Sequence, residues 1–151
     1  VLLYRDTNSW CPFCERVWFA LEEKGIPFET EFIDLSNKPK WYTDMVPTTL
    51  VPAAKIEGNL VYESKDILLA LEEKFGRTLL PDDPEEYSVA LQLVEESETN
   101  GFLGAAYNFL KENTLDYIEV ANHQVAFETK LDELEQLLGK YPGAYFLSTF
   151  S

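Results

Sequence analysis

The chain has two cysteines, Cys11 and Cys14, and their three-residue spacing carries the strongest chemical signal in the sequence. They enclose Pro12 and Phe13, where an extended apolar segment gives way to a helical pattern. The first N–H groups of a helix carry partial positive charge, which favours a thiolate and lowers the pKa of a nearby thiol. Proline suits the first helical position, where its missing N–H is not needed. We therefore predict that Cys11 is a nucleophile just outside the helix and that Cys14, one turn in, is a resolving thiol.

Other roles for the cysteine pair are less favoured. Two cysteines and one distant histidine, His123, are too few for a zinc site, which usually has four ligands, so we expect no metal site. A structural disulfide across so short a loop would add little stability. Inert buried cysteines remain an alternative, but the CxxC spacing favours redox or nucleophilic chemistry.

Charge and hydropathy restrict the partners. The net charge is −15, with 8 basic and 13 acidic residues in 1–76 against 4 basic and 14 acidic residues in 77–151. This acidic balance argues against nucleic acid as a partner, and its asymmetry supports a domain boundary near residue 77. No apolar run approaches the roughly 18 residues of a membrane span. Few cysteines with a CxxC fit a reducing compartment. We expect a cytoplasmic protein, or an organellar one if a transit segment was removed.

The first 76 residues alternate strands and helices in the order β-α-β, loop, β-β-α. This order is that of an α/β thioredoxin-like domain, whose first βαβ unit brings a helix N-terminus to the ligand-binding edge of the sheet. The patterns predict strands over 1–5, 28–35, 53–56 and 60–62, helices over 11–24 and 64–75, and a short helix near Trp41 in the loop 36–49.

The second half of the chain is predicted to be all-helical. After a linker over 77–84, Asp83 as N-cap and Pro84 at the first helical position begin a helix that runs to about Asn113. A second helix follows over about 115–138. We thus expect a thioredoxin-like domain over 1–76 and a partial helical domain over 85–151. The apolar residues spaced for burial in these helices are Ala90, Leu93, Val94, Leu103, Ala106, Leu110, Ile118, Ala121, Val125, Leu131, Leu134 and Leu138.

These elements, in this order, resemble a cytosolic glutathione transferase of the cysteine-containing classes. The omega class is the most similar, with the lambda and dehydroascorbate reductase classes as relatives. Omega proteins usually have alanine where Cys14 stands. The residues 145–151 resemble the family's approach to a further helix, so we expect the chain to be C-terminally truncated. The motifs that carry the resemblance are Cys11–Arg16, Asn37–Trp41, Leu50–Ala53, Tyr62–Ser64 and Leu79–Pro84.

The resemblance implies a site for glutathione, a tripeptide with two carboxylates, an amine and a thiol, used as cosubstrate. The backbone of Val51 would pair with the cysteinyl part of glutathione, and Pro52, after a cis bond, would hold the turn. Pro47 also follows a valine, but Pro52 is preferred because a strand follows it directly. Phe13 would line the surroundings of Cys11, either touching the ligand or packing in the core.

The resemblance also implies residues for the charged ends of glutathione. Ser64, predicted to cap the helix that begins there, would bind the γ-glutamyl carboxylate, and Glu63 would contact the γ-glutamyl amine. Lys38 would reach the glycyl carboxylate. Arg16 is expected to form ion pairs away from the site.

The implied function is a glutathione-dependent thiol transferase or reductase that works through a Cys11–glutathione mixed disulfide. It would remove glutathione from glutathionylated substrates or reduce dehydroascorbate. The expected partners are glutathione and glutathionylated or small electrophilic substrates, and the family resemblance allows a homodimer. Cys14 leaves the choice between a monothiol and a dithiol cycle open. Two alternatives also stay open: a non-catalytic binding or interaction module with the glutathione fold, and a Cys-Pro-Phe-Cys dithiol isomerase of the prostaglandin-synthase type.

Overall fold

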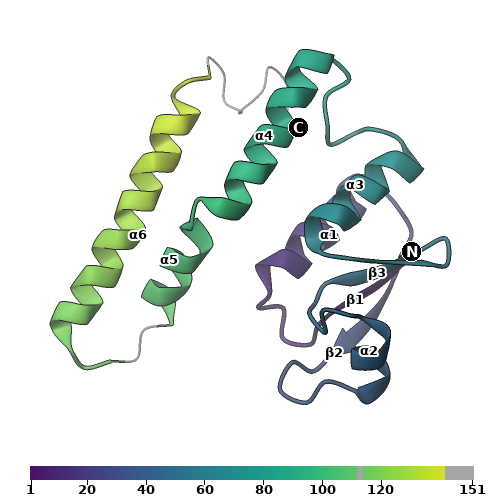
Figure 1. Ribbon diagram of the computed structural model, residues 1–151, viewed down its shortest axis with the longest axis horizontal. Helices are drawn as coiled ribbons and strands as arrows, with labels where there is room; N and C mark the ends of the chain where they lie inside the picture. Colours follow the sequence, from purple (N-terminus) through teal and green to yellow (C-terminus); the bar gives the residue numbers. More distant parts are fainter. Residues whose placement is uncertain (112–113, 142–151) are drawn as a thin grey trace. The chain divides into compact units, whose positions relative to one another are not determined.

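The computed structural model describes residues 1–111 and 114–141, which fall into two units (Figure 1). The first unit is Val1–Leu80 and the second begins at Pro81. This division lies within the segment 77–84 that the sequence indicates as a linker.

The first unit is a four-stranded mixed sheet with helices packed against it (Figure 1). Its elements are β1 (Leu2–Asp6), α1 (Pro12–Glu23), β2 (Glu29–Ile33), α2 (Lys40–Met45), β3 (Ala53–Ile56), β4 (Asn59–Tyr62) and α3 (Ser64–Phe75). The strand order is β2-β1-β3-β4, with β1 parallel to β2 and antiparallel to β3, and β3 antiparallel to β4. This mixed sheet with its helices confirms the predicted thioredoxin-like class.

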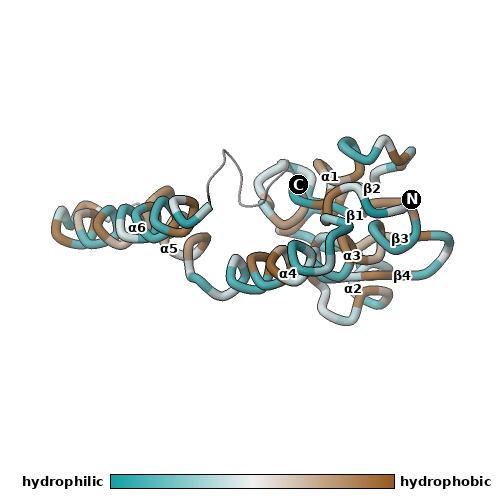
Figure 2. The backbone as a smooth tube through the Cα atoms, turned by 90° about the horizontal axis from the view of Figure 1, so that it is seen from above, coloured by the Kyte–Doolittle hydropathy of each residue, from teal (hydrophilic) through white to brown (hydrophobic). Residues whose placement is uncertain are grey.

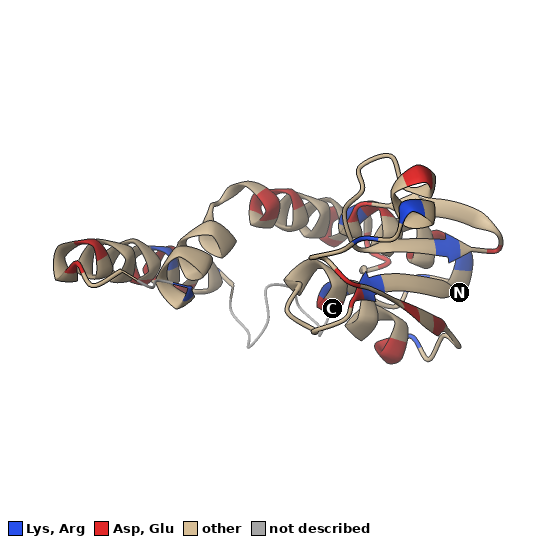
Figure 3. Ribbon diagram, turned by 90° about the horizontal axis from the view of Figure 1, so that it is seen from below, with Lys and Arg blue, Asp and Glu red and all other residues tan. Residues whose placement is uncertain are grey.

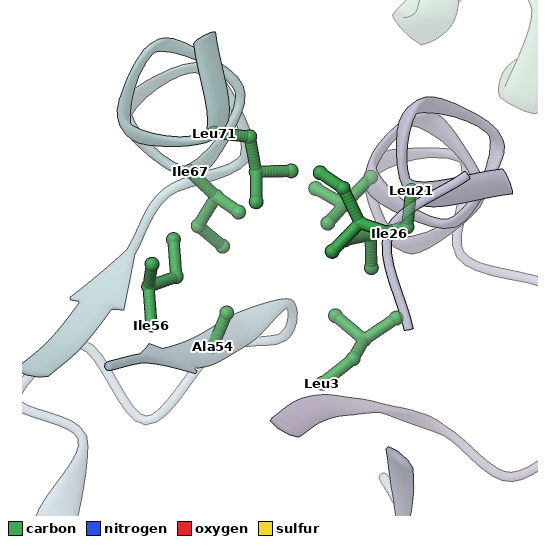
Figure 4. Close-up of a cluster of buried hydrophobic side chains, with 8 residues drawn as sticks. Leu3, Leu21, Ile26, Ala54, Ile56, Ile67 and Leu71 are labelled. Atoms are coloured by element: carbon green, nitrogen blue, oxygen red, sulfur yellow. The ribbon is translucent and has the colours of Figure 1, made fainter. Parts of the chain in front are cut away.

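Each face of the sheet is covered by a separate apolar cluster. One face packs against α1 and α3, and Figure 4 shows side chains of both helices meeting those of β1 and β3. The opposite face packs against α2. The first cluster consists of Leu3, Val17, Leu21, Ile26, Ala54, Ile56, Ile67 and Leu71, and the second of Tyr4, Ile33, Tyr42, Val46 and Ala53. Successive residues of β1 and β3 point to opposite clusters, as strand geometry requires.

A buried carboxylate ties the end of the first unit to its core. Glu72 of α3, 5% exposed, accepts hydrogen bonds from the backbone N–H groups of Thr78, Leu79 and Leu80 at 3.1, 3.2 and 3.1 Å. Its other oxygen pairs with the buried ammonium of Lys24, at the end of α1. One side chain therefore satisfies three backbone donors and a cation, which fixes the chain where it leaves α3.

The second unit is helical, with α4 (Pro84–Thr99), α5 (Phe102–Leu110) and α6 (Tyr117–Leu138). Asp83 caps α4 as predicted, accepting from the N–H groups of Glu85 and Glu86. The prediction of a single helix up to Asn113 is wrong, because the helix is interrupted between α4 and α5. Gly101 has φ of 76°, a left-handed conformation that suits glycine. Asn113 itself lies outside the described residues, as do 145–151.

Most of the apolar positions expected to be buried in the helical unit are half-buried or exposed. Ala90 is buried, whereas Leu110, Ile118 and Val125 are 73%, 73% and 61% exposed. Figure 2 shows apolar and polar residues interspersed along α6, and Figure 3 shows the acidic residues on these helices. Helical spacing therefore identified amphipathic helices but not the burial of each position. Within the described residues, no helix is long and apolar enough to cross a membrane.

Candidate functional site

Cys11 stands immediately before α1, as the sequence predicts. It is the N-cap residue in an extended conformation, with Pro12 at the first helical position. Its carbonyl accepts the first helical hydrogen bonds, from the N–H groups of Cys14 and Glu15 at 3.0 and 3.1 Å. The residue is half-buried and its thiol is free. Cys11 therefore lies at the positive end of a helix dipole and keeps access to solvent.

Cys14 is fully buried one turn into α1, and its thiol is also free. A hydrogen bond from the Cys14 side chain lowers the pKa of Cys11 to about 7, assisted by the N–H groups of Cys14 and Phe13 and opposed by burial and by Asp6. The same interaction with Cys11, together with burial, raises the pKa of Cys14. The pair therefore divides into an ionisable outer thiol and a protonated inner thiol that donates to it.

Asp6, the last residue of β1, completes the cysteine site, although no spacing in the sequence pointed to it. It is 1% exposed, and its Oδ2 accepts from the Trp10 N–H at 2.7 Å, which fixes the loop before Cys11. Its Oδ1 is buried and accepts no hydrogen bond from any residue that the structure describes. A carboxylate oxygen of Asp6 and the two cysteine sulfurs lie within 4.8 Å of one another, a donor set that could hold a metal ion.

The loop before β3 presents its backbone to Cys11. The Val51–Pro52 bond is cis, as the resemblance implies, and the Cys11 Sγ lies 3.8 Å from the Val51 carbonyl oxygen, which it can reach as a weak donor. The backbone carbonyls of the two preceding residues each accept a hydrogen bond from a side chain. Lys38 Nζ donates to the Thr49 oxygen at 2.9 Å, and the Tyr42 hydroxyl donates to the Leu50 oxygen at 2.6 Å.

Three consecutive carbonyls are thus positioned, one of them directly beside the reactive sulfur. Lys38 supports this loop by donating to a backbone carbonyl, whereas the resemblance implies that it binds a carboxylate of the ligand. Tyr42, fully buried, was missed as a supporting residue, because an aromatic residue in a polar segment gives no spacing signal. Burial raises the pKa of Tyr42, so its hydroxyl stays protonated and donates across the neutral range.

The N-terminus of α3 lies next to α1. Ser64 is the first residue of α3 and is 6% exposed, while Glu63 precedes it as the N-cap with φ of 70°. The prediction that Ser64 is the cap residue is therefore wrong by one position. Arg16 was expected to pair away from the site, but its Nη1 donates to Ser64 Oγ at 3.3 Å. Its guanidinium also lies 5.4 Å from the centre of the Phe13 ring.

The geometry therefore joins Phe13, Arg16 and Ser64 in one chain of contacts between α1 and α3. A guanidinium beside a helix N-terminus is suited to a carboxylate, because both supply positive potential and hydrogen-bond donors. Glu63 is exposed, and among residues 1–111 and 114–141 no side-chain contact assigns it a role. The helical unit has a separate pocket between α4 and α6, which includes Leu93, Ser97, Lys130 and Leu137 but neither cysteine.

Comparison with known proteins places these features in a family. The family model described as "Glutathione S-transferase, N-terminal domain" matches residues 10–74. Glutathione S-transferase DHAR2 of Arabidopsis thaliana is 33% identical over 140 residues, covering 93% of this chain and 60% of the relative. Glutathione S-transferase omega-1 of Sus scrofa is 32% identical over 139 residues, covering 91% and 56%.

Another relative is glutathione S-transferase L2, chloroplastic, of Arabidopsis thaliana, which is 35% identical over 146 residues, covering 93% of this chain and 46% of the relative. The chain thus spans between 46% and 60% of the length of these three relatives. The crystal structure of glutathione transferase Omega 3C from Trametes versicolor superposes with a TM-score of 0.79 at 26% identity, covering 99% of this chain and 62% of that chain. The segment matched by the family model holds both cysteines, the cis bond and Ser64, and relatives align along most of the chain. Residues 10–74 therefore belong to the glutathione S-transferase N-terminal domain family, and the chain as a whole is similar to glutathione S-transferases.

Proposed function

We propose that this chain carries the reactive half of a glutathione-dependent thiol transferase whose nucleophile is Cys11. The observation that carries the proposal is the arrangement of the two thiols. Cys11 is half-buried at a helix N-terminus, and the buried Cys14 donates a hydrogen bond that stabilises its thiolate. An ionised, accessible sulfur is the requirement for attack on a disulfide.

The first proposed step is a disulfide exchange. The Cys11 thiolate attacks the glutathionyl sulfur of a mixed disulfide, forming a Cys11–glutathione disulfide and releasing the substrate thiolate, which takes a proton from water. In the second step the thiolate of another glutathione attacks the bound glutathionyl sulfur. Oxidised glutathione leaves and the Cys11 thiolate is restored. With dehydroascorbate as a second acceptor, two glutathiones would supply the two electrons through the same cysteine.

The buried thiol favours a monothiol cycle. Attack by Cys14 on a Cys11–glutathione disulfide needs a Cys14 thiolate, but hydrogen bonding to Cys11 and burial raise the pKa of Cys14. Cys14 is also fully buried, so its role in the proposal is to donate to Cys11.

Two sets of contacts support glutathione as the cosubstrate. The Val51 backbone lies beside the sulfur and would pair with the cysteinyl part, with Pro52 holding the turn. Ser64, with the N-terminus of α3 and Arg16, would bind the γ-glutamyl carboxylate. Two further roles stay part of the proposal: Glu63 would bind the γ-glutamyl amine, and Lys38 the glycyl carboxylate.

The proposed chemistry needs reduced thiols, so we propose a reducing compartment, the cytoplasm or an organelle such as the chloroplast named for one relative. Turnover tests the function. The chain, reduced and metal-free, is expected to catalyse the reduction of a small glutathionyl mixed disulfide by glutathione, followed through the formation of oxidised glutathione. Binding of glutathione without turnover would contradict it and favour a non-catalytic module.

The reactivity of Cys11 is expected to follow pH through a midpoint near 7. Below this pKa the thiol is protonated and reacts slowly, and above it the thiolate reacts at its full rate. Measuring the rate of iodoacetamide alkylation against pH checks the midpoint, with Cys11 identified by peptide mass spectrometry. Cys14→Ala removes the largest stabilising contact of the thiolate, so the midpoint should rise toward that of an ordinary thiol, about 8.5. A midpoint unchanged in Cys14→Ala would contradict the role of Cys14.

Tyr42→Phe is expected to weaken glutathione binding through the loop at Val51. Loss of the hydroxyl leaves the Leu50 carbonyl without its donor, which costs about 1 kcal/mol of stability and loosens the backbone beside Cys11. A comparable loss in binding would raise KM for glutathione about fivefold with little change in kcat. Tyr62→Phe is the matched control, since Tyr62 packs against the same apolar cluster. Equal KM values in the two variants would refute the supporting role of Tyr42.

A further inference from the structure

The buried carboxylate beside the two thiols does not suit a site built for a thiolate alone. Burial of a carboxylate oxygen without a donor costs free energy, and nearly all buried polar atoms in native proteins have a partner. Asp6 Oδ1 has none among the described residues, although Asp6 is 99% buried, being 1% exposed. A cation bound by the Asp6 carboxylate would offset this cost.

The three donors suit one class of cation. A carboxylate oxygen of Asp6 and the sulfurs of Cys11 and Cys14 lie within 4.8 Å of one another, so a single ion can contact all three. Thiolate sulfur selects Zn²⁺ over the hard cations Mg²⁺ and Ca²⁺, which take oxygen ligands. Zn²⁺ also accepts a carboxylate as a ligand and keeps a tetrahedral arrangement with sulfur.

We propose that Asp6, Cys11 and Cys14 form a three-residue Zn²⁺ site whose fourth position is open to water or to an added thiolate. Asp6 and Cys14 are buried, and Cys11 is half-buried, so the open position faces the side from which solvent reaches Cys11. The cysteines and the histidine alone predicted no metal site, because they are too few for four ligands. The third ligand is an aspartate at the end of the preceding strand, five residues before Cys11.

Binding is an acid–base reaction without electron transfer. Zn²⁺ forms bonds to both sulfurs and to a carboxylate oxygen, and each cysteine that is a thiol loses its proton to solvent. A Cys11–Cys14 disulfide has no thiolate to offer, so the oxidised chain would not bind. The ion would occupy the sulfur that attacks substrates, and Zn²⁺ would therefore inhibit thiol transfer. The inhibition rests on the proposed function, whereas the binding does not.

The test is a titration of the reduced full chain with ZnCl₂ against a chromogenic chelator. We expect one Zn²⁺ per chain, and none for the chain oxidised to the disulfide. Asp6→Asn keeps an oxygen that can accept the Trp10 N–H but removes the anionic ligand, so the affinity should fall at least about tenfold. Asp34→Asn, which changes an exposed carboxylate of the same unit, should leave the affinity unchanged. Wild-type affinity in Asp6→Asn, or no binding by the reduced chain at micromolar Zn²⁺, would overturn the proposal.

A measurement on the wild-type chain covers the case in which Asp6→Asn does not fold. X-ray absorption of the bound Zn²⁺ should show two sulfur neighbours at about 2.3 Å and oxygen neighbours at about 2.0–2.2 Å. Four sulfur neighbours would mean that two chains share the ion, and would overturn the three-residue site. Inhibition of turnover should follow the same Zn²⁺ concentration dependence and reverse with chelator. Absence of turnover in the metal-free chain would instead contradict the proposed function and leave the binding result intact.

Discussion

Replacing Cys11 by alanine is expected to lower glutathione-dependent thiol transfer by at least about a thousandfold, because the group that forms the mixed disulfide is removed. Cys11 is the accessible member of the pair, whereas Cys14 is fully buried and its pKa is raised by hydrogen bonding to Cys11 and by burial. The measurement is the initial rate of reduction of a small glutathionyl disulfide at pH 7. Retained activity in Cys11→Ala would contradict the assignment of the nucleophile.

Two substitutions of Cys14 distinguish its role as a hydrogen-bond donor to Cys11 from a role as an attacking thiol. Cys14→Ser keeps a hydroxyl that can donate to the Cys11 thiolate, so most of the turnover at pH 7 should remain. Cys14→Ala loses this donor, and its turnover should fall about tenfold at pH 7 and recover as the pH rises above the new pKa of Cys11. After exposure to oxidised glutathione, both variants should carry one glutathionyl group, on Cys11. Loss of turnover in Cys14→Ser at every pH would instead indicate that Cys14 attacks as a resolving thiol.

Glu72→Ala is expected to lower the free energy of unfolding of the first unit by about 3–5 kcal/mol. The change removes the buried partner of Lys24, whose side chain is 1% exposed, and leaves a cation in the core without its carboxylate. It also removes the acceptor of three backbone N–H groups, those of Thr78, Leu79 and Leu80. Lys24 would keep two acceptors, the Gly76 carbonyl at 2.6 Å and the Thr78 hydroxyl at 2.9 Å, neither of which carries a negative charge.

Tryptophan fluorescence during urea unfolding reports this effect selectively. The three tryptophans of the chain, Trp10, Trp18 and Trp41, all lie in the first unit, so the signal follows that unit even when the helical unit unfolds separately. Glu73→Ala is the matched control, because Glu73 is the next residue of α3 and is exposed. It should change stability by less than about 0.5 kcal/mol. Equal midpoints for the two variants would show that the buried pair does not hold the end of the first unit in place.

Local sequence signals predicted the elements well where one physical rule dominated. Proline after Cys11 fixed the start of α1, and Asp83 before Pro84 fixed the start of α4, because caps act over a few residues. The break at Gly101 was missed because the apolar spacing continues on both sides of it. In the structure α4 ends at Thr99, and the Oδ1 of its C-cap residue Asn100 accepts a hydrogen bond from the Phe102 N–H at 2.9 Å. Ser64 was misplaced by one residue, since a serine at a helix start resembles a cap whether or not it is the cap.

The sequence by itself determined the order of the elements, the thioredoxin-like class and the position of the two thiols at a helix start, because these depend on near neighbours in the chain. The tertiary structure decided what surrounds those thiols. Asp6 comes from the end of a strand, Tyr42 from a short helix on the opposite face of the sheet, and Arg16 meets Ser64 across 48 residues. None of these contacts follows from a regular spacing of residues in the sequence. They exist because strand pairing and the two apolar clusters bring distant segments together, and burial then decides which carboxylate, hydroxyl or thiol keeps its proton.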